Sequence, residues 1–129
     1  MLLPAWCAPR RADSVEVIGA ALVAKAAGAG YRRIAADLGR PAGTIRRWLR
    51  AATRPPHLEW LRQRGIDHAA RLQAEVLADV SASSSPLADA LTALAAAVTA
   101  YQRRITRPVP AWTLIGIFTS GRLLPAPAS

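Results

Sequence analysis

Three arginines in one short segment, Arg46, Arg47 and Arg50, have the type and spacing to recognise a nucleic acid. Arg50 follows Arg46 by four positions and Arg47 by three, so the three side chains would share one side of a helix. The planar guanidinium can donate hydrogen bonds to O6 and N7 of one guanine at the same time. The segment therefore predicts a helix that reads base edges in duplex DNA.

Four residues nearby extend the expected contact with DNA. Arg32 and Arg33 are suited to backbone phosphates, which attract cations whatever the base sequence. Gly43 lies near the start of the expected helix, where a missing side chain would let the backbone approach the DNA. The hydroxyl of Thr44 could donate to a phosphate. The simpler interpretation is that Gly43 is only tolerated and that Thr44 caps the helix.

The apolar residues around these arginines predict how the arginines are positioned. Between Tyr31 and Leu49 they have the spacing of a helix-turn-helix, with framework positions at Ile34, Ala35, Leu38, Gly39, Ile45 and Trp48. Residues three or four positions apart share a helix face, and a glycine after the last apolar residue lets the chain turn with positive φ. We expect helices at 31–38 and 42–52, preceded by one at about 14–27. These form a homeodomain-like unit; the alternative is a small helical hairpin with a solvated charged face.

The net charge of +9 is concentrated in the same part of the chain. The span from Arg10 to Arg54 has ten basic and three acidic residues, a net charge of +7, and the rest of the chain contributes +2. A positive field that coincides with the expected helix-turn-helix favours binding to phosphate.

The composition of the chain and the positions of its helix-ending segments predict an all-α protein with one DNA-binding domain and a helical extension. Prolines at 55 and 56 end the third helix, and the run SASSSP marks a linker. We expect an extended lead-in at 1–12, a helix-turn-helix domain at 13–54, a helical connector at 55–80, a Ser-rich linker at 81–86, and a C-terminal helical region at 87–129 that includes a helix near 112–118 and an irregular tail.

Apolar residues in the C-terminal region alternate steps of four and three, as in a coiled coil. They are Leu87, Leu91, Leu94, Val98, Tyr101 and Ile105. The pattern lasts only about two and a half heptads, so we favour packing of this helix on residues 58–80 of the same chain. A homodimer through the same six residues is the alternative.

Several classes of site and location are not supported by the sequence. Cys7 is the only cysteine, and with His57 and His68 it offers three scattered ligands where structural zinc needs four. We therefore expect no metal and no cofactor. No uncharged apolar run reaches the roughly 18 residues that a membrane span needs, and the N-terminus lacks the charge order of a signal peptide. We expect a cytoplasmic protein that does not enter a membrane.

Three stretches resemble a known family: PAWCAPRRADSVEVIGAAL, GYRRIAADLGRPAGTIRRWLR and AWTLIGIFTSGRLL. They are similar to an uncharacterised helix-turn-helix family of high-GC bacteria that is related to insertion-sequence transposases. The resemblance implies DNA binding, at transposon ends for example, with Arg46 and Arg47 as DNA contacts. Members often carry a cysteine-rich zinc ribbon ahead of the Leu-Pro segment. This sequence contains no such ribbon, and we expect either a shortened variant or a misplaced start.

His68, Arg71 and Tyr101 partly match the HxxR and tyrosine of tyrosine recombinases, which would indicate an enzyme. No His or Trp lies between Arg71 and Tyr101, and Tyr101 falls on the apolar seam, so we expect no catalytic activity. The predicted function is sequence-specific DNA binding by a transposase-associated protein or a small transcriptional regulator. The alternative is a helical interaction module in which residues 57–124 bind a partner and the basic face is incidental.

Overall fold

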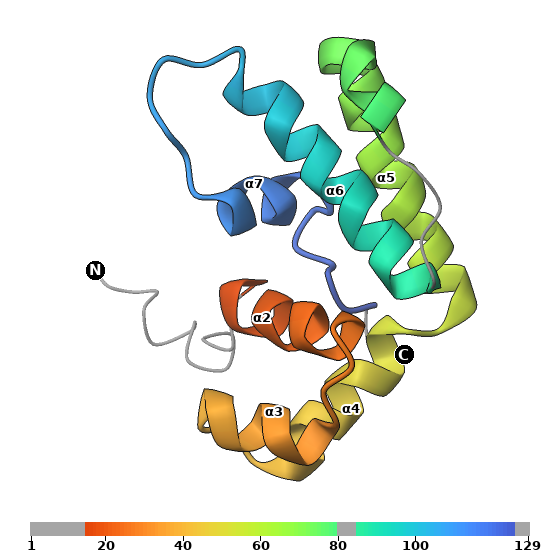
Figure 1. Ribbon diagram of the computed structural model, residues 1–129, viewed down its shortest axis with the longest axis vertical. Helices are drawn as coiled ribbons and strands as arrows, with labels where there is room; N and C mark the ends of the chain where they lie inside the picture. Colours follow the sequence, from red (N-terminus) through yellow and green to blue (C-terminus); the bar gives the residue numbers. More distant parts are fainter. Residues whose placement is uncertain (1–14, 80–84, 126–129) are drawn as a thin grey trace.

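The computed structural model describes residues 15–79 and 85–125, and its regular structure there is entirely helical (Figure 1). This confirms the all-α prediction. The elements are α2 (Val15–Ala26), α3 (Tyr31–Leu38), α4 (Ala42–Ala52), α5 (Pro55–Gln73), the 3-10 helix η1 (Ala74–Asp79), α6 (Pro86–Gln102) and α7 (Ala111–Phe118). The predicted lead-in at 1–12, with Cys7, lies outside the described residues. Within the described ranges no helix combines the length and apolar character needed to cross a bilayer.

The turn between α3 and α4 is set by Gly39 and Pro41. Gly39 has φ 65° and ψ 37°, and its N–H bonds the carbonyl of Ala35, so it ends α3 in the left-handed conformation that glycine adopts without strain. Pro41, with φ −60° and ψ 140°, then precedes the first residue of α4. Both helices have the bounds that the sequence predicts, 31–38 and 42–52.

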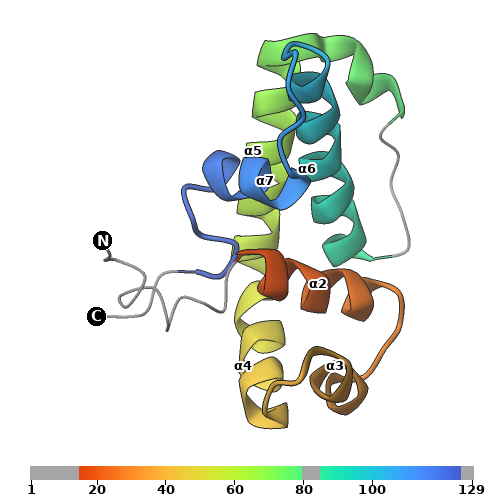
Figure 2. The ribbon, with the colours of Figure 1, turned by 90° about the vertical axis from the view of Figure 1, so that its left-hand side faces the viewer.

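The longest helices, α5 and α6, run side by side in the same direction (Figures 1 and 2). Near their last turns Arg104 Nε donates to the carbonyl of Leu72 at 2.7 Å, and Arg103 donates to Gln73 at 3.3 Å. The expected packing of the C-terminal helix on residues 58–80 is therefore confirmed.

The predicted coiled-coil seam is only partly correct, because Ile105 lies beyond the end of α6. The helix stops at Gln102, where the Arg104 N–H bonds the carbonyl of Tyr101 in a turn. The side chain of Gln102 donates to the carbonyl of Val109 and holds the returning chain. The chain therefore leaves the helix and turns towards α7 soon after Tyr101, the last of the predicted seam residues that lies on α6.

Helix α2 lies between the two halves of the molecule, with α3 and α4 on one side and α6 and α7 on the other (Figures 1 and 2). The core is continuous across it. One cluster of buried side chains includes Leu22 of α2, Ile45 of α4, Leu61 of α5 and Leu94 of α6. The α3–α4 pair is therefore supported by the same core as the C-terminal helices.

Candidate nucleic-acid interface

Helix α4 separates an apolar face from a basic one. Ile45 is fully buried and Trp48 is 6% exposed, whereas Arg46, Arg47 and Arg50 are exposed. Burial of Trp48 agrees with its expected role in the core. Because the buried apolar residues fix the rotation of α4 about its axis, the side chains of the three arginines lie on the solvent side of the helix.

Arg46 is held by Tyr31, the first residue of α3. The guanidinium carbon of Arg46 lies 5.7 Å from the centre of the Tyr31 ring, and that of Arg32 lies 5.6 Å from it. Arg32 Nε also donates to the Tyr31 hydroxyl at 3.2 Å. One half-buried ring thus positions an arginine from each of two helices through cation–π attraction. The sequence reasoning missed Tyr31, although an aromatic residue directly before Arg32 was a visible signal.

A second missed residue is Arg54, at the N-cap of α5. The hollow beside α4, of about 390 Å³, is lined by Gly43, Arg46, Arg47, Arg50, Ala51 and Arg54. Arg54 follows Arg50 by four positions and continues the same stripe past the end of the helix, a spacing that could have identified it. Four arginines that line one hollow favour the binding of phosphate there.

The basic residues of α3 and the following turn have local partners. Arg33 lies 3.9 Å from Asp37 in a solvent-exposed pair one helical turn apart, which contributes little to stability. Arg40 is half-buried and donates to the carbonyl of Leu38 at 3.2 Å, where it bonds the last turn of α3. Arg33 therefore remains suited to phosphate, while Arg40 has a structural bond that the sequence did not predict.

Gly43 and Thr44 lie in the first turn of α4, which has no side-chain cap. A Cβ at Gly43 would meet no other atom within 4 Å, so nothing within the fold requires glycine there. Thr44 is half-buried, and its N–H bonds the carbonyl of Pro41. The structure thus leaves open space beside Gly43, on the same face as Arg47.

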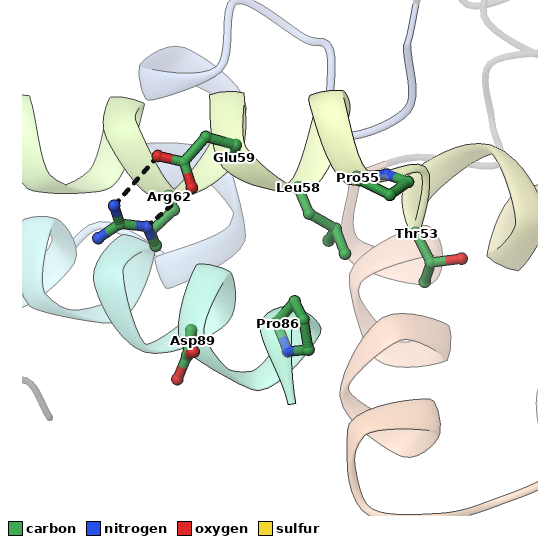
Figure 3. A pocket seen from close by; sticks show the side chains of 7 residues that line it. All are labelled: Thr53, Pro55, Leu58, Glu59, Arg62, Pro86 and Asp89. Carbon is green, nitrogen blue, oxygen red and sulfur yellow. Dashed lines mark hydrogen bonds and ion pairs between the residues drawn. The ribbon is translucent and has the colours of Figure 1, made fainter. Parts of the chain in front are cut away.

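Another hollow, of about 430 Å³, lies at the corner where α4 meets α5 and α6 begins (Figure 3). Its wall includes Glu59 and Asp89. Among the described residues that line it, Arg62 is the one cation, and it bonds Glu59 through two hydrogen bonds of 3.0 and 3.1 Å. This contact lowers the pKa of the Glu59 carboxyl. Two carboxylates against one paired guanidinium disfavour an anion, so of these two hollows the one beside α4 is suited to phosphate.

Of the three residues that partly match tyrosine recombinases, His68 and Tyr101 contact Phe118 and Arg71 does not share this contact. The His68 ring stacks on Phe118 with centroids 4.6 Å apart, and Tyr101 meets it edge-on at 6.2 Å, while Arg71 is exposed. Burial, with Arg64 and Arg71 nearby, lowers the pKa of His68. These contacts show that the rings of His68 and Tyr101 pack against Phe118. In the described part of the chain, no three His, Cys, Asp or Glu side chains cluster as metal ligands would.

The residues of the predicted seam that lie on α6 have three different surroundings. Leu87 and Leu94 are buried, at 5% and 0% exposure, in the core shared with α5. Leu91 and Val98 border a hollow between α2, α6 and α7, and Tyr101 lies against Phe118. A single surface formed by all six residues is therefore not present in this fold.

Comparison with protein families, with curated proteins and with solved structures found no match to this chain. The resemblance to transposase-related helix-turn-helix proteins stays a prediction.

Proposed function

We propose that this chain is a sequence-specific DNA-binding protein without catalytic activity of its own. In this proposal α2, α3 and α4 form a homeodomain-like helix-turn-helix, and α4 is the helix that enters the major groove. The role in the cell would be that of a transposase-associated factor or a small transcriptional regulator.

The observation that carries the proposal is the division of α4 into a buried face with Ile45 and Trp48 and an exposed face with three arginines. These three line one hollow together with Arg54, which follows the helix. Between residues 31 and 58 the sequence has seven arginines and one acid, Asp37. An uninterrupted positive surface on a rigid helix favours an extended polyanion over a small neutral ligand.

The expected contacts divide by position. Arg47 and Arg50 are the candidates for contacts with base edges. Arg46, which is held by Tyr31, approaches the DNA from the N-terminal part of α4. Arg32 and Arg33 contact the phosphate backbone, as does Arg54 at the far end of the stripe. Gly43 leaves room for the backbone to come near the DNA, and Thr44 donates to a phosphate.

The test is binding of a labelled duplex of random sequence at several salt concentrations, followed by selection of preferred sites. If about five arginines contact phosphate, log K against log salt should slope near −4 to −5. The variant in which Arg46, Arg47 and Arg50 are all alanine should lose most of its affinity. The matched control replaces Arg71, Arg103 and Arg107, three exposed arginines of the C-terminal half, and removes the same charge.

The control should keep affinity within a few-fold of the wild type and keep the same preferred site. Equal losses in the two triple variants would show that net charge alone attracts the DNA. That result, or a salt slope near zero, would favour the alternative of a helical interaction module whose basic face is incidental.

A further inference from the structure

The chain leaves α7 through a tight turn that sets the direction of the C-terminal tail, residues 119–125. Ser120 and Gly121 follow one another in the left-handed region of the backbone, with φ of 55° and 75°. Glycine adopts this conformation freely, whereas serine does so at a cost in energy. The N–H of Arg122 then bonds the carbonyl of Thr119 at 2.9 Å. The fold thus holds a strained turn that sends the tail in one direction.

The tail is anchored at the start of α5. Leu123 is 1% exposed and belongs to the core cluster shared with α4 and α5. Its carbonyl accepts a hydrogen bond from Nε2 of His57 at 2.8 Å. His57 lies one turn beyond Arg54, the N-cap of α5. Figures 1 and 2 both show the tail reaching the junction of α4 and α5. The fold therefore brings Arg122 to the end of the arginine stripe of α4, from a distant part of the sequence.

The tail lies on the open side of this junction. The buried face of α4, with Ile45 and Trp48, packs towards α2 and α3. Figure 2 shows α2 and α3 on one side of the α4–α5 junction and the dark-blue tail on the other. Arg122 is exposed, and none of the described acids forms an ion pair with it. Its guanidinium is therefore free, within the described residues, to bind an anion from outside.

We propose that Arg122 binds a phosphate of the DNA backbone beside the one that Arg54 contacts, so that the tail forms a second part of the DNA interface. This inference rests on the proposed function. In a homeodomain-like unit the C-terminal end of the recognition helix lies against the DNA backbone. Arg54 follows that end of α4, and the tail is anchored one turn further along, at His57. Each strand carries a phosphate about every 3.4 Å, so the two arginines can each bind one.

The charge of the two segments that meet here supports a polyanion as the ligand. The sequence has no Asp or Glu between Asp37 and Glu59, and none after Asp89. The stripe of α4 and the tail both come from these acid-free stretches. Arg122 therefore extends the positive surface past Arg54 without an acid between them in either stretch, as a row of phosphates requires.

Titration of the selected duplex with the full chain, at several salt concentrations, tests the tail contact. Arg122→Ala should weaken binding by a few-fold on all sequences alike and make the slope of log K against log salt shallower by about one unit. Arg107→Ala is the matched control, because Arg107 is also exposed, lies in the same acid-free stretch between α6 and α7, and removes the same charge. It should leave the slope nearly unchanged. Both variants should keep the circular dichroism spectrum of the wild type.

Ethylation of single phosphates in the duplex locates the contact. One phosphate at which ethylation blocks the wild type should no longer matter for Arg122→Ala, and it should lie close to the one lost in Arg54→Ala. Equal slopes for Arg122→Ala and Arg107→Ala would overturn the tail contact and leave the proposed function standing. So would a lost phosphate far from that of Arg54. A wild type with a salt slope near zero would overturn both proposals.

Discussion

Gly65 of α5 lies against the backbone of Ala93 in α6, and there is no room for a side chain between them. A Cβ built on Gly65 would be 2.5 Å from the carbonyl carbon of Ala93 and 2.6 Å from its oxygen. In a helix interior glycine is less favourable than alanine by about 1 kcal/mol. Here it permits the close approach of the two longest helices.

Gly65→Ala should therefore destabilise the chain in spite of its better helix propensity. The added methyl group meets backbone, which cannot turn aside, and such overpacking costs about 1–3 kcal/mol. Gly43→Ala is the control, because a Cβ there meets nothing within 4 Å and should raise stability by up to about 1 kcal/mol. Urea unfolding followed by circular dichroism measures both changes. A stabilised Gly65→Ala would mean that α5 and α6 are farther apart than described.

The local part of this fold was predictable from the sequence. The bounds of α3 and α4 follow from Ile34, Leu38, Ile45 and Trp48, which mark one face of each helix, and from Gly39, which ends the first. The exposed arginines of α4 follow from the same period. Such features depend on residues that lie within one or two helical turns of each other, so the spacing of apolar residues in the sequence is enough to predict them.

Of the long-range part, the packing of the C-terminal helix on residues 58–80 was expected, but its direction and its closest contacts were not. Nothing near Gly65 or Gly19 in the sequence reveals that α6 crosses the first, or that the Trp112 ring would lie 2.5 Å from a Cβ on the second. The same holds for the direction of α6, because a connection from 74 to 85 is long enough to return the chain to the start of α5. The packing of α6 on α5 determines which of the predicted seam residues face α5.

Trp48→Ala should come close to unfolding the protein. Truncation of a buried tryptophan typically costs about 3–5 kcal/mol, a large part of the stability of a small domain. The measurement is urea unfolding of the whole chain, since the core around Ile45 continues into α5 and α6. Trp60→Ala is the control: Trp60 is half-buried, stacks on His57 at 5.6 Å, and should cost less. Normal stability of Trp48→Ala with lost DNA binding would assign Trp48 to the interface.

His68 should make the stability of the chain depend on pH. Burial is the main cause of its lowered pKa, with added repulsion from Arg64 and Arg71 against opposing attraction from Asp67. A group with a lower pKa in the folded state binds fewer protons there than in the unfolded state. Its contribution is therefore fully present above the unfolded value of about 6.5 and is lost as pH falls below it.

Thermal unfolding at about pH 7.5 and about pH 5.5 measures this effect. Replacement by leucine keeps an apolar side chain against Phe118 and removes the titrating group. The melting temperature of the wild type should fall more between the two pH values than that of His68→Leu. Equal falls would assign the pH dependence to titrating groups other than His68.

Tyr31 should act on DNA binding through the arginines that it holds. Tyr31→Phe keeps the ring under Arg46 and removes only the hydroxyl that bonds Arg32, so affinity should change little. Tyr31→Leu removes both cation–π contacts, each worth about 0.5–1 kcal/mol at an exposed site, and should weaken binding by a few-fold to about tenfold. Repeating Tyr31→Leu in an Arg46→Ala background isolates the coupling. A loss undiminished in that background would show that Tyr31 does not act through Arg46.

Arg47 tests the orientation of α4 on DNA most directly. Its side chain lines the hollow beside Gly43, one turn into the helix, whereas Arg33 lies at the start of α3 and pairs only weakly with exposed Asp37. Arg47→Lys keeps the charge but removes the planar fork that contacts O6 and N7 of guanine together. It should cost about 1–3 kcal/mol on the preferred site and relax preference at one base position.

Arg33→Ala should behave differently, because a phosphate contact carries no base preference. Affinity for all sequences should fall alike, and the slope of log K against log salt should become shallower by about one unit. Both variants are compared with the wild type at the same salt concentration, by selection from a random library and by titration of the selected site. Unchanged preference in Arg47→Lys together with altered preference in Arg33→Ala would mean that α3, and not α4, faces the base edges.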